Sequence, residues 1–446
     1  MQPHWHSLAV IALPPLPRYS AVVLVLAMLA VLVPTTAASA ATSYDLEARY
    51  TAKIDLDWDT RWVDVRTTID LVNTSGRTID RLQLNSAAVK LGGHKNLRAR
   101  VDGGNVTPSV VGQTIKVPLG RALPPGGTAE VFVGFRSRLK TTAAKRAYYF
   151  AKLNGVAQLY RVIPWVSRKV PFGTGDHGEP FVTPVSPRVE VTVSSDRKLV
   201  WATSGRRIKK INDKTFVYVA KKVRDFNLAA SPDWKSASGT SRNGKVTITA
   251  YTRRHDAKRL VRLAREELAR YAAKTGVGYP HQTYRVAETG GGLAMESPAL
   301  IWIPRSRSSA DLPYLVSHET AHQWWYSTVG NDQSTSAFAD EALADYFSRK
   351  AHLSIRSSRC PTDRLDREIR AYSDVCYFEV IYIQGARFLD KMRRDHGNKK
   401  FMAAIRAYTK SNRHDISNNA RLLEAFRAEM GDGLLKRFSS RFPSIY

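Results

Sequence analysis

The chain has 446 residues, about three times the roughly 150 of an ordinary domain, so two or three domains are expected. Its composition, with 43% hydrophobic, 10% aromatic and 24% charged residues, excludes a wholly disordered, collagen-like or multi-spanning chain. The 68 Lys and Arg residues outnumber the 39 Asp and Glu residues and give a formal net charge of +29. This charge suits a polyanionic neighbour but does not identify one.

The first forty residues predict a secretory signal peptide. An uninterrupted apolar run extends from Ala21 to Val33, and small residues with an A-x-A-like cleavage site follow it near Ala40. The run is shorter than the roughly twenty apolar residues of a membrane-spanning helix, so an uncleaved anchor is the less favoured alternative. We therefore expect residues 1–40 to be removed from a secreted, extracytoplasmic protein.

Export changes which partners are expected. Nucleic acid is not expected, because secreted proteins seldom meet it and no basic helix or aromatic RNA-binding signature occurs. Contact with an anionic cell envelope is the partner that the charge suggests, although the basic residues could equally serve solubility alone. The two cysteines, Cys360 and Cys376, would close a short disulfide loop in an oxidising compartment if their side chains meet. The sequence does not show that they do.

Residues 41–239 are predicted to form a β-rich domain. Apolar and polar residues alternate, as in residues 64–72 and 189–193, and clusters of Gly, Pro and Asn separate the alternating runs. Turn signals recur at residues 102–105 and 124–127. The pattern indicates an antiparallel β-sandwich or saddle.

Residues 240–446 are predicted to form a mainly helical domain. After a hairpin signal at Asn243 and Gly244, the apolar period changes from 2 to 3.6 residues, and a helix is predicted over 256–274 with its end at Gly276. Two short strands are expected at 284–287 and 300–303. The remainder, from Asp311 onward, is mostly helical, so the whole chain is assigned to the α+β class.

The pentapeptide His318-Glu319-Thr320-Ala321-His322 is an H-E-x-x-H motif inside a helix predicted from about Pro313 to Gly330. Residues four apart lie on one face of a helix, so both imidazoles can reach a single zinc ion. Glu319 lies one position round the helix and can contact a water molecule without ligating the metal. The alternative is a pair of histidines that are hydrogen-bonded within a helical core and bind no metal.

A tetrahedral zinc site that also binds water needs a third protein ligand. Eighteen residues separate Glu341 from His322, and Glu341 lies in a predicted helix over 338–346. Asp345, one turn further, is predicted to accept a hydrogen bond from the free N–H of a ligand imidazole. It is equally consistent with the sequence that Asp345 is an ordinary solvated carboxylate on the helix surface.

Three motifs together carry a family resemblance. Residues 318–325 followed by Glu341 resemble the gluzincin signature of the aminopeptidase N family of zinc metallopeptidases. Residues 293–297 are similar to that family's Gly-Ala-Met-Glu-Asn motif, and residues 382–385 are similar to its Tyr-x-Lys-Gly element, with Gln384 in place of lysine. The resemblance implies an N-terminal β domain and a thermolysin-like catalytic domain, in a short form without the family's C-terminal helical domain.

The resemblance also implies roles for individual residues. One zinc ion per chain would be held by His318, His322 and Glu341, where it would activate water and polarise the scissile carbonyl. Glu319 would act as the general base, and the Tyr382 hydroxyl would stabilise the developing oxyanion. A half-buried core tyrosine is the alternative for Tyr382.

Recognition of substrate would rest on the second motif. Glu296 would pair with the free α-ammonium group of a peptide, beside Met295 and Ala294, which makes a secreted zinc aminopeptidase the expected function. A turn carboxylate is the alternative for Glu296. Leu293 and Ser297 depart from the motif's glycine and asparagine, and a cleft without the C-terminal domain would be open. A zinc endopeptidase and a catalytically silent, envelope-binding module therefore stay as alternative functions.

Overall fold

A computed structural model describes residues 46–167 and 183–446. The signal peptide predicted for residues 1–40 lies outside the described residues and stays a prediction. Within the described residues, no helix combines the length and apolar character that a membrane span requires.

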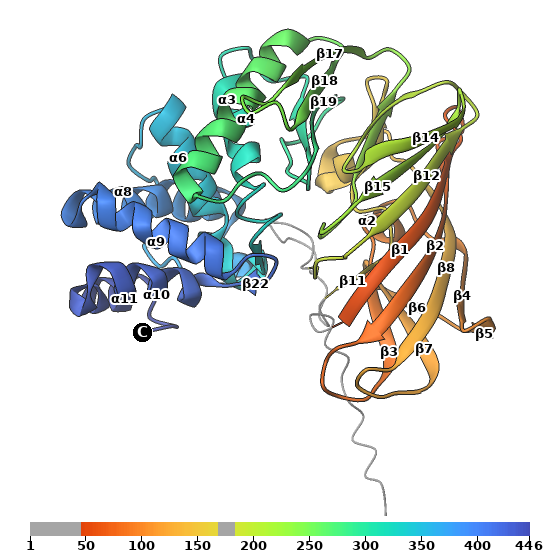
Figure 1. Ribbon diagram of the computed structural model, residues 1–446, viewed down its shortest axis with the longest axis horizontal. Helices are drawn as coiled ribbons and strands as arrows, with labels where there is room; N and C mark the ends of the chain where they lie inside the picture. Colours follow the sequence, from red (N-terminus) through yellow and green to blue (C-terminus); the bar gives the residue numbers. More distant parts are fainter. Residues whose placement is uncertain (1–45, 168–182) are drawn as a thin grey trace, which may run out of the picture. The chain divides into compact units, whose positions relative to one another are not determined.

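The N-terminal part is built mainly from two facing sheets (Figure 1). The larger sheet has eight strands in the order β14 (Arg206–Asn212), β15 (Thr215–Ala220), β12 (Val189–Ser195), β1 (Leu46–Leu56), β2 (Trp62–Asn73), β8 (Thr128–Arg138), β4 (Lys95–Val101) and β5 (Gly104–Val106). The second has the order β11 (Trp165–Val166), β3 (Ile79–Asn85), β7 (Thr114–Leu123) and β6 (Ser109–Val111). Buried residues from both sheets form one hydrophobic cluster. The predicted β-sandwich is confirmed.

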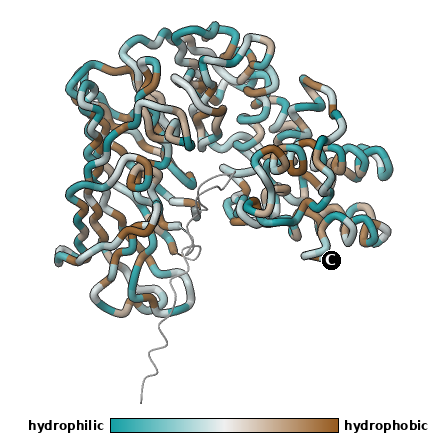
Figure 2. Tube along the Cα trace, turned by 180° about the vertical axis from the view of Figure 1, so that it is seen from behind, coloured by the Kyte–Doolittle hydropathy of each residue, from teal (hydrophilic) through white to brown (hydrophobic). Residues whose placement is uncertain are grey.

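Alternation explains why these segments form strands. In β1 every second residue from Leu46 to Leu56 is buried, because successive side chains of a strand point to opposite faces. The strands show this alternation of hydrophobic and hydrophilic residues along the trace (Figure 2). One detail differs from the prediction: β1 and β12 run parallel, with Tyr50 opposite Val189, so the sheet is mixed. A long stretch of chain separates these two strands, and hence no tight hairpin forces them to be antiparallel.

Two smaller sheets lead to the helical part. One contains β13 (Val200–Thr203), β16 (Leu228–Ser231), β10 (Val156–Leu159) and β9 (Phe150–Leu153). The other contains β17 (Lys235–Thr240), β18 (Thr247–Thr252), β19 (Thr283–Thr289) and β20 (Leu300–Pro304), so the predicted hairpin and both predicted short strands are confirmed. The predicted domain boundary after residue 239 falls within β17 and stays a prediction.

Helix α3 (Ala257–Thr275) follows the predicted pattern closely. The Asp256 side chain accepts hydrogen bonds from the first backbone N–H groups, and Gly276 ends the helix with a positive φ of 68°. The other helices of eight or more residues in the described chain are α4 (Leu312–Ala321), α6 (Glu341–His352), α8 (Gly385–His396), α9 (Asn398–Ser411) and α10 (Asn419–Met430). The shorter helical segments include α2 (Ala87–Leu91), α5 (Gln333–Ser336), α7 (Asp374–Tyr377), η5 (Phe378–Gln384) and α11 (Leu435–Arg441). The helical part and the sheet β17–β20 share a second hydrophobic core.

The helix that carries the H-E-x-x-H motif is shorter than predicted. It ends at Ala321 with His322 as its C-terminal cap, whereas the sequence pattern predicted a helix to Gly330. The two following indoles anchor the chain in different places: Trp324 donates to the Val277 carbonyl at 2.7 Å and Trp325 donates to Thr409 Oγ1 at 3.1 Å. Because both rings are buried, the backbone turns away from the helix axis after His322.

The two cysteines form a disulfide, which the sequence had left open. The Cys360–Cys376 bond joins Cα atoms 5.6 Å apart and closes a loop with a sequence separation of 16. Cys376 lies in α7, directly before the π-helical segment η5 that contains Tyr382. The disulfide therefore ties the segment after α6 to the element that carries this tyrosine.

Close packing at Gly385 leads to a stability prediction. A Cβ atom at Gly385 would lie 2.6 Å from the Cβ of Ala342, the residue that follows Glu341. Alanine normally favours a helix, but this overlap would push α8 away from α6, so we expect Gly385→Ala to reduce the free energy of unfolding by about 1–3 kcal/mol. Urea denaturation would measure this change.

Gly433 offers a matched control. A Cβ atom there meets nothing within 4 Å, so Gly433→Ala should change the free energy of unfolding by less than about 0.5 kcal/mol. A Gly385→Ala protein as stable as the parent would show that α6 and α8 are not in the tight contact described.

Candidate active site

Three buried ligand atoms converge at one point between α4 and α6. His318 Nε2 lies 3.3 Å from His322 Nε2 and 3.3 Å from Glu341 Oε2, and His322 Nε2 lies 3.5 Å from the same oxygen. Tetrahedral zinc with bonds of about 2.0–2.1 Å separates its ligand atoms by about 3.3–3.4 Å. All three separations match this geometry, so the residues present fit a zinc ion.

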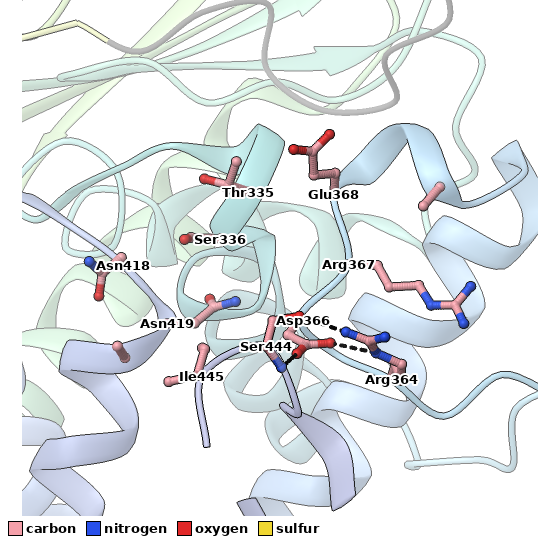
Figure 3. Close-up of a pocket in the computed structure, with 12 residues that line it drawn as sticks. Thr335, Ser336, Arg364, Asp366, Arg367, Glu368, Asn418, Asn419, Ser444 and Ile445 are labelled. Carbon is pink, nitrogen blue, oxygen red and sulfur yellow. Dashed lines mark hydrogen bonds and ion pairs between the residues drawn. The ribbon is translucent and has the colours of Figure 1, made fainter. Parts of the chain in front are cut away.

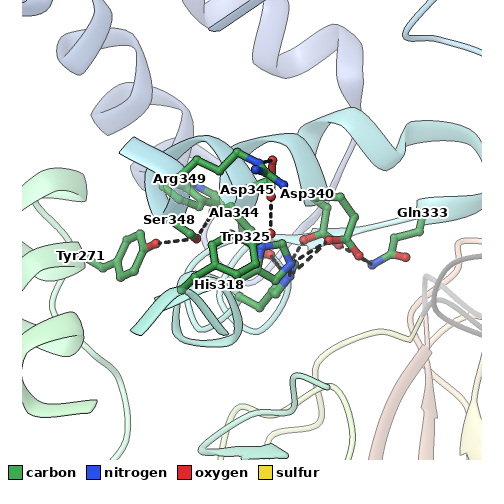
Figure 4. Close-up of polar contacts among 12 residues, drawn as sticks. Tyr271, His318, Trp325, Gln333, Asp340, Ala344, Asp345, Ser348 and Arg349 are labelled. Carbon is green, nitrogen blue, oxygen red and sulfur yellow. Dashed lines mark hydrogen bonds and ion pairs between the residues drawn. The ribbon is translucent and has the colours of Figure 1, made fainter. Parts of the chain in front are cut away.

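A hydrogen bond orients one of these imidazoles. His322 Nδ1 donates to Asp340 Oδ1 at 2.8 Å and is also 3.0 Å from the Trp325 carbonyl, so the proton on Nδ1 leaves Nε2 free for a metal. Asp340 is itself held by Gln333, whose Nε2 donates to Oδ2 at 2.9 Å; Figure 4 shows the Gln333 side chain pointing toward this carboxylate. Neither Asp340 nor Gln333 was predicted as part of the site.

The prediction that Asp345 supports a ligand imidazole is wrong. The Asp345 carboxylate accepts a hydrogen bond from the Tyr314 hydroxyl and forms an ion pair with Arg349 at 2.6 Å, as Figure 4 shows for Arg349. The helix that begins at Glu341 places Asp345 one turn along its axis, beyond the imidazoles. Asp340 precedes the first turn and therefore lies next to His322.

The buried charges around the ligand atoms shift one another's pKa values. Burial raises the pKa of the Glu319 carboxyl to about 7. Burial alone would raise the pKa of Glu341, but the attraction of His322 and His318 outweighs it and lowers that pKa. Burial alone would lower the pKa of His322, but the attraction of Glu296, Asp340 and Glu341 outweighs it and raises that pKa. A metal that binds here would displace the proton from His322, because only the neutral ring can ligate.

Two further carboxylates lie next to the ligand atoms. Glu296, Glu319 and His322 each offer an atom within 4.8 Å of the other two. Glu319 therefore lies beside the candidate metal position without belonging to the set of three ligands that converge there. Glu296 reaches the same place from the loop before β20.

Tyr382 projects into the site from η5. Its ring stacks on the His318 ring, with centroids 5.7 Å apart and planes at 15°. Burial and the neighbouring Glu341 raise the pKa of the Tyr382 hydroxyl well above its usual range, so the hydroxyl keeps its proton at neutral pH and is able to donate it in a hydrogen bond. A π-helical turn is uncommon and is often found at functional sites.

A glutamine not singled out from the sequence links the two motifs. Gln323 Nε2 donates to the Ser297 carbonyl at 2.8 Å, and Gln323 Oε1 accepts from the backbone N–H of Ala299 at 2.9 Å. Asn227 donates to Ser297 Oγ at 2.6 Å. These bonds fix the loop that carries Glu296 against the end of α4. The only sequence signal was the position of Gln323 directly after His322, which does not indicate a partner.

The candidate metal position opens into a pocket of about 280 Å³. Its lining includes every residue predicted to bind substrate or to act in catalysis, together with residues from η5 and α4: Leu293, Ala294, Met295, Glu296, Arg307, Tyr314, Leu315, His318, Glu319, Glu341, Phe378, Tyr382 and Tyr149. A larger pocket of about 720 Å³ lies near the start of α10, where Arg364 and the Ser444 backbone already bind Asp366 (Figure 3). None of the candidate metal ligands lines this larger pocket, so size does not identify the active site.

No protein-family model and no curated protein sequence matches the chain. Its structure is similar to crystal structures of two-domain M1 zinc metallopeptidases. A glutamate-to-alanine variant bound to L-tryptophan gives a TM-score of 0.67 at 16% identity, covering 90% of this chain and 95% of that chain. A variant from Deinococcus radiodurans bound to a Tyr-Ser-Ala substrate gives 0.66 at 16% identity with the same coverage.

A third structure, of a variant bound to L-arginine, gives a TM-score of 0.65 at 17% identity and covers 90% of this chain and 97% of that chain. The chain thus has the two-domain fold of the M1 zinc metallopeptidases, and the predicted α+β class is confirmed. The resemblance to the aminopeptidase N family is confirmed at the level of the fold.

The two aspartates give a paired prediction. We expect Asp340→Asn to weaken zinc binding by about 10- to 100-fold, because the His322 ring loses the carboxylate that orients it and raises its basicity. Asp345→Asn should leave zinc affinity within about threefold and instead reduce stability, since Arg349 loses its buried partner. Competition with a chromophoric chelator and urea denaturation would separate the effects. Equal zinc affinities in the two variants would contradict the assignment of Asp340.

Proposed function

We propose that this chain is an exported zinc aminopeptidase that removes residues one at a time from the N-termini of peptides. The proposal depends on one observation above all: three ligand atoms spaced for tetrahedral zinc lie beside two further buried carboxylates, Glu296 and Glu319. The match to metallopeptidase folds with bound amino acids and a bound peptide supports it.

The proposed reaction divides between the metal and one carboxylate. Zinc at His318, His322 and Glu341 would supply a Lewis acid that activates water and polarises the scissile carbonyl. Glu319 takes a proton from the attacking water as the new C–O bond forms. The same carboxyl then delivers that proton to the departing amine as the C–N bond breaks, so the base is regenerated.

Recognition of the free N-terminus is assigned to Glu296. A carboxylate oxygen of the buried Glu296 lies within 4.8 Å of a carboxylate oxygen of Glu319 and a ring nitrogen of His322. An α-ammonium group bound to Glu296 would therefore place the first peptide bond next to the metal position. A charge-assisted contact in a buried site selects strongly against a substrate that lacks the charge. Glu296 therefore favours an exopeptidase over an endopeptidase.

Tyr382 is assigned to the carbonyl oxygen. Its hydroxyl is protonated and lines the same pocket as Glu319, so it can donate a hydrogen bond as negative charge develops on that oxygen. Removing one such donor typically costs about 10²- to 10³-fold in turnover.

Export completes the proposal. The N-terminal pattern of a signal peptide suggests it, and the disulfide between Cys360 and Cys376 supports it, because disulfides persist in oxidising compartments. The net charge of +29 favours contact with an anionic cell envelope once the protein is outside.

A substrate panel tests the function. We expect the zinc-loaded protein to hydrolyse aminoacyl p-nitroanilides and free peptides and to leave their N-acetylated forms intact, since acetylation removes the charge that Glu296 binds. Mass spectrometry of timed digests would show the loss of single N-terminal residues. Cleavage of blocked and free peptides alike would indicate an endopeptidase, and no cleavage at any zinc loading would indicate a silent binding module.

The general base has its own test. We expect Glu319→Gln to retain one zinc per chain by atomic spectroscopy and to reduce kcat by about 10³-fold or more, because the amide cannot accept the proton. Turnover close to that of the parent, with zinc retained, would refute the role assigned to Glu319.

The ammonium contact has a different kinetic signature. We expect Glu296→Gln to raise KM for free dipeptides by about tenfold or more, because the amide carries no charge. The ratio of the hydrolysis rate of free substrates to that of N-acetylated substrates should fall for the same reason. Zinc content should be unchanged. A variant with parental selectivity would show that another group recognises the N-terminus.

A further inference from the structure

A separate pocket of about 580 Å³ lies between α8 and α11, apart from the candidate active site. Three basic residues of α8 spaced by four and three positions line it, and two more come from α11: Arg387, Lys391, Arg394, Arg437 and Arg441. Residues at this spacing share one helix face. Asp390 is the only carboxylate among the lining residues that the structure describes.

Aromatic packing brings the two basic faces together. The Phe388 ring of α8 lies 6.3 Å from the Phe438 ring of α11 and 5.5 Å from the Phe442 ring, measured between centroids. All three rings are buried. Hydrophobic burial thus holds the basic side chains in proximity in spite of their mutual repulsion.

Each carboxylate near the pocket already forms ion pairs with more than one basic side chain. Asp390 contacts Lys350, Arg393 and Arg394 at 3.2–3.4 Å. Asp395 contacts Lys391 at 3.1 Å and Arg437 at 2.6 Å. Each carboxylate therefore faces at least two cations, and the pocket retains an excess of positive charge.

Two guanidinium groups have no carboxylate within ion-pair distance among the described residues. Arg387 donates to Ser357 Oγ at 2.8 Å, and Arg441 donates to Gln384 Oε1 at 2.7 Å, so both are bound only to neutral oxygens. Arg441 Nε is buried and has no hydrogen-bond partner in the described chain. Burial lowers the pKa of Arg441; the Asp363 carboxylate opposes this shift, and the positive charge of Arg387 adds to it.

We propose that this pocket is a binding site for a phosphate-bearing anion, with Arg387 and Arg441 as its principal contacts. Guanidinium groups bind phosphate oxygens through paired N–H donors, and a doubly charged oxyanion would offset the repulsion between the two arginines. The volume exceeds the needs of a single phosphate ion and suits a diphosphate or the phosphate of a larger headgroup. Lys391 and Arg394, at the exposed side, would contact further negative charge.

Titration calorimetry with inorganic pyrophosphate tests the site in the mature protein. We expect saturable binding of one pyrophosphate, weakened about tenfold by Arg387→Gln and further by Arg387→Gln with Arg441→Gln. Arg387 is exposed, so its substitution alone keeps the test valid if the double variant folds poorly. Arg427→Gln is the matched control: it removes the same charge from a surface arginine that is paired with Glu424 and Asp432, and it should change affinity by less than twofold.

Vesicles distinguish a lipid headgroup from a soluble phosphate. Sedimentation with phosphatidylglycerol vesicles, compared with phosphatidylcholine vesicles, should show binding that Arg387→Gln weakens if the source is a headgroup. Pyrophosphate binding without vesicle binding would identify a soluble ligand of the same chemistry. Absence of saturable binding in both assays, or binding that Arg387→Gln and Arg427→Gln weaken equally, would overturn the proposal in favour of diffuse surface charge.

Discussion

The candidate site depends on the convergence of three buried ligand atoms from two helices. His318 and His322 approach from the end of α4, and Glu341 approaches from the first turn of α6, to separations that suit tetrahedral zinc. With Glu319 and Asp340 also buried there, the region holds an excess of carboxylates over cations. Isolated charges in a protein interior are costly, so a divalent cation at this point is the simplest way to stabilise the arrangement.

Packing around the site keeps the two helices in register. The indole of Trp325, just after α4, stacks on Phe347 of α6 with centroids 5.1 Å apart. On the other side of α6, the absence of a side chain at Gly385 lets α8 approach Ala342. The ligand positions are therefore set by large buried rings and by the close approach of α8 to α6 at Gly385.

The basic residues occupy two kinds of position. Those exposed on the surface give the protein a high positive charge of the kind that raises solubility and attracts anions. In the pocket between α8 and α11 they are concentrated by aromatic packing, and two of them, Arg387 and Arg441, form no ion pair with a carboxylate in the described chain. A peptidase exported to an anionic envelope would gain from such a site. A phosphate group of the envelope bound there would hold the enzyme at the envelope and leave the catalytic pocket free.

Local sequence was sufficient for the features that depend on periodicity and spacing. It predicted the change from strands to helices, the end of helix α3 at Gly276, and the pair His318 and His322, because four-residue spacing on a helix is a local property. Glu341 was expected from the need for a third ligand and from the family resemblance. It did not predict that α4 ends at Ala321, that Asp340 rather than Asp345 holds His322, or that Gln323 binds the loop of Glu296. These outcomes depend on where the backbone turns once distant side chains are buried, and only the tertiary structure decides which groups then meet.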